Sequence, residues 1–159
     1  MKLLRTIRFD GSDDQVYERA AGPDEWAVSG AFAFADLDAA ALTGKRRQAF
    51  ANGFLSLDSF GRSTFVTVAE IGADDLEGLV DRLARHFIAH YGAPDREAAL
   101  PAARDEIGFA QELCQEAPIN TVLAVSRRLD EDGGIREAVR SVAPPGEAAH
   151  ARIWDVVEE

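Results

Sequence analysis

Apolar and polar side chains alternate along several short segments, which is the pattern of strands that place one face on a core. In the N-terminal part of the chain, these segments are separated by the turn sequences DGSD and GPD. The alternation predicts strands over 3–9, 15–20 and 26–35. Segment 26–35 shows the clearest pattern, because its aromatic residues fall on alternate positions, with Gly30 at an expected bulge.

Two further pairs of apolar segments flank short turn sequences and predict β-hairpins. Segments 54–57 and 62–71 surround the turn DSFG, and the second segment is rich in β-branched residues. Segments 120–129 and 135–142 surround the turn DEDGG. A last alternating segment, 151–157, predicts one more strand.

Apolar residues recur at spacings of three and four between 75 and 91, which predicts a long amphipathic helix. Asp74 and Glu77 form a capping-box pattern at its start, and Gly92 and Pro94 follow its end. Its expected inward residues are Leu76, Leu79, Val80, Leu83, Phe87 and Tyr91.

A second helix is predicted over 102–117, with Pro101 near its first turn and Pro118 after its end. Its expected inward residues are Ala103, Ile107, Ala110, Cys114 and Ala117. The position of Cys114 on this stripe favours a buried packing role over that of a reactive thiolate.

Segment 37–51 has two interpretations that differ at Gly44. In the first, Asp36 caps one continuous helix, and Gly53 ends it in the left-handed conformation. In the second, Gly44 breaks the helix and Thr43 caps a new one. The sequence leaves both interpretations open.

The second interpretation places three consecutive cations, Lys45, Arg46 and Arg47, at the positive end of a helix dipole. A bound anion would relieve this repulsion, whereas on one continuous helix the same residues form a solvated face. The neighbouring predicted hairpin supplies further donors for an anion. The candidate ligand-binding residues are Lys45, Arg46, Arg47, Ser59, Arg62 and Ser63.

The order of these elements predicts an α+β fold, because strands occur in hairpins and two helices are consecutive. We expect a mostly antiparallel sheet of about six to eight strands, with about two to three helices packed on one face. The sequence shows no internal repeat or interdomain linker, and 159 residues suit a single domain over 1–159.

The net charge of −11 argues against a nucleic-acid partner, which would require a basic face. The single cysteine, Cys114, allows no intrachain disulfide and is typical of a reducing compartment. Charges interrupt the N-terminal apolar residues, and no uncharged apolar run approaches the roughly 18 residues of a membrane span. We therefore expect an acidic cytoplasmic protein without a membrane partner.

His86 and His90 lie four residues apart on the predicted helix, a spacing that can present two imidazoles to one metal. The sequence between them lacks the glutamate of a zinc-protease motif, and histidines are common in amphipathic faces. We favour packing histidines and no metal, with a site at His86 and His90 as the weaker alternative. No cofactor is expected, and no catalytic residue is assigned, because phosphate-loop and nucleophile-elbow motifs are incomplete.

The sequences KLLRTIRFDGSD, EWAVSGAFAFAD, RQAFANGFLSLDSFGRSTFVTVAEI and ARIWDVVEE together resemble a small uncharacterised bacterial family. The resemblance extends over nearly the whole chain and implies a stand-alone domain with no established activity. It therefore assigns no site residue.

Two functional hypotheses follow. The first is a non-catalytic binding or accessory domain that forms a homodimer or binds a protein partner, because aromatic residues are abundant on the predicted strands. The second is a small-molecule enzyme or ligand binder that holds a small anion with arginine side chains, since guanidinium groups bind carboxylates and phosphates in a bidentate manner. The second requires the arginines to converge on one concave site.

Overall fold

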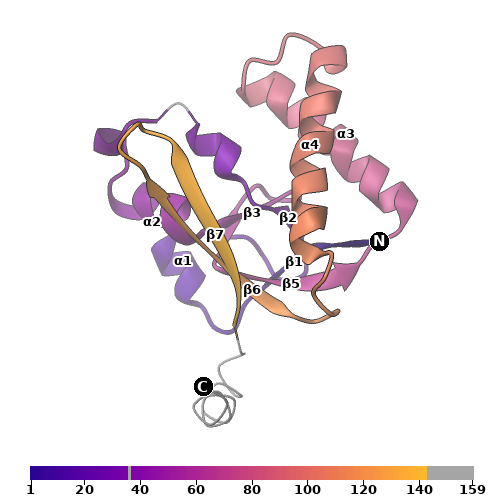
Figure 1. Cartoon of the computed structure of the whole chain (residues 1–159), viewed down its shortest axis with the longest axis horizontal. Helices are drawn as coiled ribbons and strands as arrows, with labels where there is room; N and C mark the ends of the chain where they lie inside the picture. Colours follow the sequence, from indigo (N-terminus) through magenta and orange to yellow (C-terminus); the bar gives the residue numbers. More distant parts are fainter. Residues whose placement is uncertain (36, 143–159) are drawn as a thin grey trace, which may run out of the picture.

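The computed structural model describes residues 1–35 and 37–142 and confirms an α+β fold with an antiparallel sheet. The seven strands are in the order β4-β3-β2-β1-β5-β6-β7, which is within the expected number (Figure 1). The strands are β1 Lys2–Ile7, β2 Trp26–Val28, β3 Phe54–Ser56, β4 Arg62–Ser63, β5 Phe65–Glu70, β6 Val122–Leu129 and β7 Ile135–Val142. The helices are α1 Ser12–Val16, α2 Gly44–Asn52, α3 Ala73–His90 and α4 Arg96–Cys114, with short 3₁₀ helices η1 Ala31–Phe34 and η2 Ala39–Ala41.

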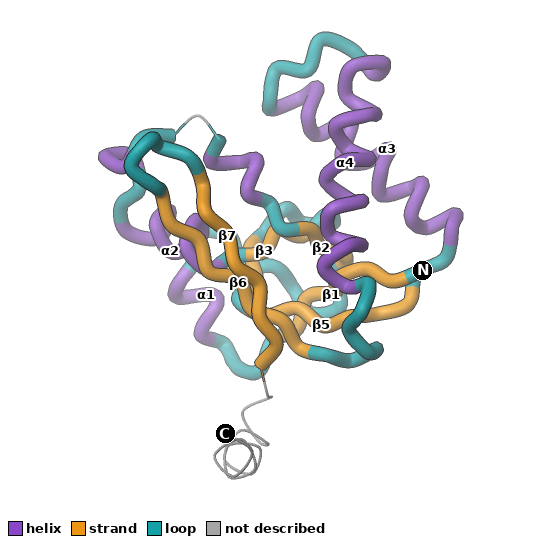
Figure 2. The backbone as a smooth tube through the Cα atoms, in the orientation of Figure 1, coloured by secondary structure: helices purple, strands orange, loops and turns teal. Residues whose placement is uncertain are grey.

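The sheet is strongly curled (Figure 2). Only Thr64 separates β4 from β5 along the chain, although β3, β2 and β1 lie between them in the sheet order. Four strand spacings in a flat sheet would measure about 19 Å, far more than this one-residue connection spans. The sheet therefore bends back until β4 approaches the end of β1, where the Ser63 hydroxyl donates to the Ile7 carbonyl at 3.4 Å.

The main core lies between the sheet and the α3–α4 pair (Figure 1). Helix α3 confirms the predicted amphipathic helix, and it buries Leu79, Val80, Leu83 and Phe87. The predicted inward position of Tyr91 is wrong, because Tyr91 is the C-cap residue and is 46% exposed. Helix α4 packs on α3 and on β1 and β2. Burying this apolar stripe supplies much of the hydrophobic stabilisation of the fold.

Both long helices begin differently from the prediction. Helix α4 starts at Arg96 rather than 102, because the Asp95 side chain caps it by accepting a hydrogen bond from the Ala98 amide at 2.9 Å. Pro101 therefore lies inside the helix. The predicted capping box of α3 is wrong, because Gly72 is the N-cap residue. The Asp74 carboxylate lies in the first turn, where it interacts favourably with the positive end of the helix dipole.

Two predicted N-terminal strands are corrected. Segment 15–20 contains the end of α1, and its only strand-like contact is a bridge from Ala20 to Arg62. Segment 26–35 is extended only over β2, because Gly30 takes a φ of +82° and turns the chain into η1. Long-range packing explains the difference, since η1 directs Phe32 towards α3 and Phe34 towards α2.

The chain breaks at Gly44, in agreement with the second interpretation of segment 37–51. Gly44 has a φ of +56° and begins α2, and the preceding residues form η2, capped by Asp38. Thr43 is the N-cap residue but makes no side-chain capping bond. The expected left-handed residue at the helix end is wrong, because Gly53 is extended with a φ of −98°. The proposed cap Asp36 lies outside the described residues.

Both predicted hairpins are confirmed, although 62–71 divides between β4 and β5. Strands β6 and β7 pair along their whole length, from Val122 opposite Val142 to Leu129 opposite Ile135. The predicted strand over 151–157 lies outside the described residues. Within the described ranges, no helix has the length and apolar character needed to cross a membrane.

Candidate functional site

Two arginines from different strands are buried at the C-terminal end of α2, where both guanidinium groups donate to the Gly53 carbonyl. Arg127 on β6 is 5% exposed and forms an ion pair with Glu137 on β7 at 2.6 Å. Its guanidinium also donates to the carbonyls of Ser29, Phe50 and Gly53 at 2.5–2.9 Å. Arg127 therefore links β6, β7, α2 and the segment after β2 through short, charge-assisted hydrogen bonds.

Arg62 on β4 is also buried, at 8% exposed, but its environment is less favourable for a charge. Its guanidinium donates to the Gly30 carbonyl at 3.4 Å and to the Gly53 carbonyl at 3.2 Å, long distances for N–H···O bonds. It lies over the Phe34 ring at 4.8 Å. Burial, with a further contribution from the Arg127 charge, lowers the pKa of Arg62 to about 9. No salt bridge joins Arg62 to a carboxylate of the described residues.

Arg62 borders a cavity of about 250 Å³ that we call the cationic cavity. The other basic side chains lining it are Arg19, Lys45 and Arg46, and one carboxylate, Glu18, is among its lining residues. Lys45 and Arg46 belong to the first turn of α2. The cavity thus combines four basic side chains in a chain whose net charge is −11.

The predicted ligand-binding residues are only partly brought together. Lys45, Arg46 and Arg62 line the cationic cavity, whereas Arg47 lines another cavity beside Arg127. The Ser59 hydroxyl donates to Glu25 at 2.6 Å, and the Ser63 hydroxyl donates to the Phe65 carbonyl at 2.7 Å. These two serines therefore make internal hydrogen bonds and are not among the residues lining the cationic cavity.

The sequence interpretation missed Arg19, Tyr17 and Tyr91 as lining residues of this cavity. It also missed Arg127, for which a signal existed: Arg127 falls two positions after Val125, on the same face of a strand. No comparable signal marks Arg19, because its position follows from the contact between its segment and β4, where the Arg62 amide donates to the Arg19 carbonyl at 2.8 Å.

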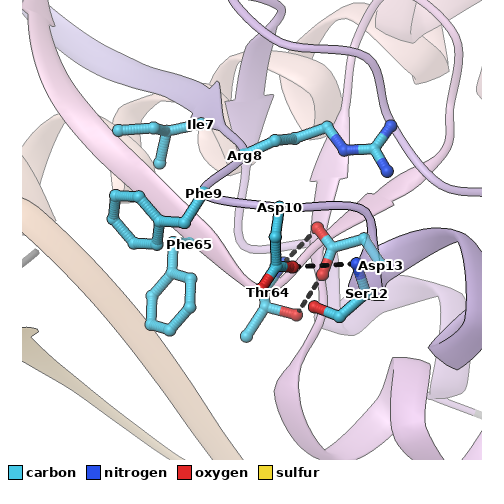
Figure 3. A pocket seen from close by; sticks show the side chains of 8 residues that line it. All are labelled: Ile7, Arg8, Phe9, Asp10, Ser12, Asp13, Thr64 and Phe65. Carbon is cyan, nitrogen blue, oxygen red and sulfur yellow. Dashed lines mark hydrogen bonds between the residues drawn. The ribbon is translucent and has the colours of Figure 1, made fainter. Parts of the chain in front are cut away.

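A smaller cavity of about 120 Å³ is lined by Thr64 and residues near the end of β1, and several of its polar groups form hydrogen bonds with one another (Figure 3). The Thr64 hydroxyl donates its proton to the Asp13 carboxylate at 2.8 Å. Because that proton is used, the Tyr17 hydroxyl is the donor in its 2.7 Å hydrogen bond to the Thr64 oxygen. Asp10 accepts from the Ser12 amide at 2.8 Å, and Arg8 pairs with Asp14. Asp13 therefore supports the position of Tyr17 through Thr64.

The two helical histidines pack against aromatic rings. His86 stacks on Phe60 with a centroid separation of 3.8 Å, and the His90 ring lies 4.9 Å from the His86 ring. Burial and the neighbouring His90 lower the pKa of His86. Among the described residues, no group of three or more potential metal-ligating side chains occurs.

Cys114 is buried, as its helical position indicated, and burial raises the pKa of its thiol to about 11. The thiol is therefore protonated at neutral pH, and we assign it a packing role rather than a chemical one.

The fold and site define an α+β domain whose curled antiparallel sheet carries two buried arginines beside a cationic cavity. The chain belongs to a family of unknown function, DUF6505, whose family model matches residues 1–154. Searches of curated proteins and of solved structures found no match.

Proposed function

We propose that this protein is a binding domain for a small carboxylate or phosphate, which it holds in the cationic cavity. The observation that carries the proposal is that four basic residues, Arg19, Lys45, Arg46 and Arg62, line one cavity. Basic side chains around one cavity repel one another, and an anion between them removes the repulsion. The anion hypothesis required the arginines to converge on one site; Arg46 and Arg62 line this cavity, whereas Arg47 lines another.

Arg62 provides the strongest physical reason for a bound anion. A buried charge is stable when it is paired and hydrogen-bonded, and Arg62 makes only long bonds to carbonyl oxygens. Arg127 shows how the same side chain is satisfied in this protein, since it has a carboxylate partner at 2.6 Å. A ligand carboxylate or phosphate would supply to Arg62 the pairing that Glu137 supplies to Arg127.

The start of α2, at the opposite end of that helix from the Gly53 carbonyl that Arg62 binds, has its own preference for an anion. Its first turn carries Lys45 and Arg46 and contains no acidic residue, although carboxylates are the side chains that stabilise this end of a helix. An anion near Lys45 and Arg46 would interact favourably with both the side chains and the helix dipole.

Calorimetric titration with sodium phosphate and with sodium acetate at low ionic strength tests the proposal. We expect saturable binding of one anion per chain. Arg46→Ala and Arg62→Met should each weaken binding by about tenfold or more, because each removes a charge-assisted interaction. Arg140→Ala, an exposed charge removal on β7, is the matched control and should leave the affinity unchanged.

Two results would reject anion binding at this cavity. One is the absence of heat and of any shift in melting temperature with either anion. The other is an equal loss of affinity in Arg46→Ala and Arg140→Ala, which would indicate a general charge effect rather than a site.

A second proposal, self-association, has its own observation. Strand β7 is an edge of the sheet, and among the described residues its only strand partner is β6. An edge strand of eight residues is a template for pairing with a second copy. We expect a dimer by light scattering at high micromolar concentration, and a monomer at that concentration would refute it.

A further inference from the structure

A second hollow, which we call the apolar groove, lies beside the cationic cavity. It measures about 360 Å³ and is bordered by η1, the end of α3 and the first half of α4. Phe32 and Phe87 form aromatic walls, and Ala98 and Ala102 leave space because their side chains are small. Its one charged lining residue is Glu106.

Tyr91 joins the two hollows, because it lines both of them. Its ring centroid lies 5.2 Å from that of Phe32 and 6.1 Å from that of Phe87, on the side of the groove. Tyr91 and Arg62 both line the cationic cavity. Tyr91 is nevertheless 46% exposed, which is unusual for a ring with these aromatic neighbours.

Helix η1 provides a second connection between the hollows. Phe32 lines the apolar groove, whereas the next two residues, Ala33 and Phe34, line the cationic cavity. One short helix and one tyrosine therefore form the common wall. A single small molecule that covers Tyr91 would reach both hollows.

Glu106 restricts what the groove accepts. Burial, together with the nearby charges of Glu137 and Asp105, raises the pKa of its carboxyl group. The surroundings of Glu106 therefore disfavour its ionised form. The anionic group of a ligand would be disfavoured beside Glu106 for the same two reasons, burial and repulsion by nearby negative charges.

We propose that the ligand is an amphipathic monocarboxylate, whose carboxylate occupies the cationic cavity and whose apolar chain crosses Tyr91 into the apolar groove. This inference rests on the proposed anion-binding function and adds the chemical class of the ligand. Charge complementarity determines the orientation, because the basic side chains lie at one end and Glu106 lines the other hollow. The apolar chain would also cover the exposed face of Tyr91.

Titration of the whole protein with acetate, butyrate, hexanoate and octanoate tests the assignment of the groove. In the wild-type protein we expect the affinity to rise by up to about fourfold for each methylene that enters the groove. Octanedioate, which carries a second carboxylate, should bind at least about tenfold more weakly than octanoate.

Ala102→Leu fills the groove with a side chain that favours helix. It should abolish the dependence on chain length and leave the affinity for acetate unchanged. Ala89→Leu is the matched control, because Ala89 is an exposed alanine of α3 that lines neither hollow, and it should behave as the wild type.

The outcomes separate the two proposals. If acetate binds but the affinity does not increase with chain length from acetate to octanoate, the amphipathic ligand is overturned and the anion site remains. Octanoate binding that survives Arg46→Ala and Arg62→Met shows an apolar site without the cationic anchor, and it overturns the amphipathic ligand, whereas the anion site is judged by the acetate and phosphate titrations of the same variants. A chain-length dependence that Ala102→Leu does not alter overturns the placement of the chain in the groove.

Discussion

Replacing Arg127 with Met is expected to lower the free energy of unfolding by about 3–5 kcal/mol. The substitution keeps an unbranched side chain in the core but removes the partner of Glu137, which is paired with Arg127 at 2.6 Å. It also leaves the carbonyls of Ser29 and Phe50 without the guanidinium donor that they have at 2.5 Å and 2.9 Å. Urea denaturation followed by circular dichroism measures the loss.

Arg62→Met is the informative comparison, because Arg62 is equally buried but has no carboxylate partner in a salt bridge of the described residues. Its removal also relieves a buried like-charge interaction with Arg127. We expect a change within about 1 kcal/mol in anion-free buffer. Arg136→Met, which removes the ion pair between the 67% exposed Arg136 side chain and Asp130, should also cost less than about 1 kcal/mol. Equal losses in Arg127→Met and Arg62→Met would contradict the different roles assigned to the two arginines.

The second large effect is expected for Gly61→Ala, which should destabilise the protein by about 2–3 kcal/mol. A Cβ atom at this position would lie 2.6 Å from the carbonyl carbon of Ala20 and 2.7 Å from its oxygen. The neighbouring backbone has little freedom to move away, because the Ala21 amide donates to the Arg62 carbonyl at 2.8 Å. The same displacement would shift Arg62, so we also expect weaker phosphate binding.

Gly78→Ala provides the control for this substitution. Gly78 lies inside α3, and an added Cβ atom would meet nothing within 4 Å. Because alanine favours helix and restricts the unfolded chain, we expect a gain of about 0.5–1 kcal/mol. If thermal denaturation shows the same melting temperature for Gly61→Ala as for the wild type, the close approach of 20–21 to Gly61 is absent in solution.

Part of the candidate site could be predicted because it depends on local pattern. The consecutive cations at 45–47 stand out in an acidic chain, and the break at Gly44 is one of the two conformations that the sequence allows. Arg62 belongs to a hairpin whose turn is encoded by neighbouring residues. The local pattern does not determine which of these side chains line the same cavity. Arg46 and Arg47 are adjacent in sequence but line different cavities.

The rest of the site depends on contacts between distant segments. Arg19 lies beside β4 because its segment runs along that strand rather than forming a strand of its own. Tyr91 fitted the apolar stripe of the predicted helix, yet it borders both hollows as the C-cap residue of α3. Neither position follows from periodicity, which reports only the residues that share a face of one element.

The sequence by itself determined the elements that local patterns encode, namely helix α3 and the β6–β7 hairpin, because 3.6-residue periodicity and turn residues act over short separations. It also determined the α+β class through the order of these elements. The tertiary structure alone decided the curl of the sheet, the short length of β2 and which basic residues line the same cavity. These features arise from packing between residues far apart in the chain, which overrides local preference where the two conflict.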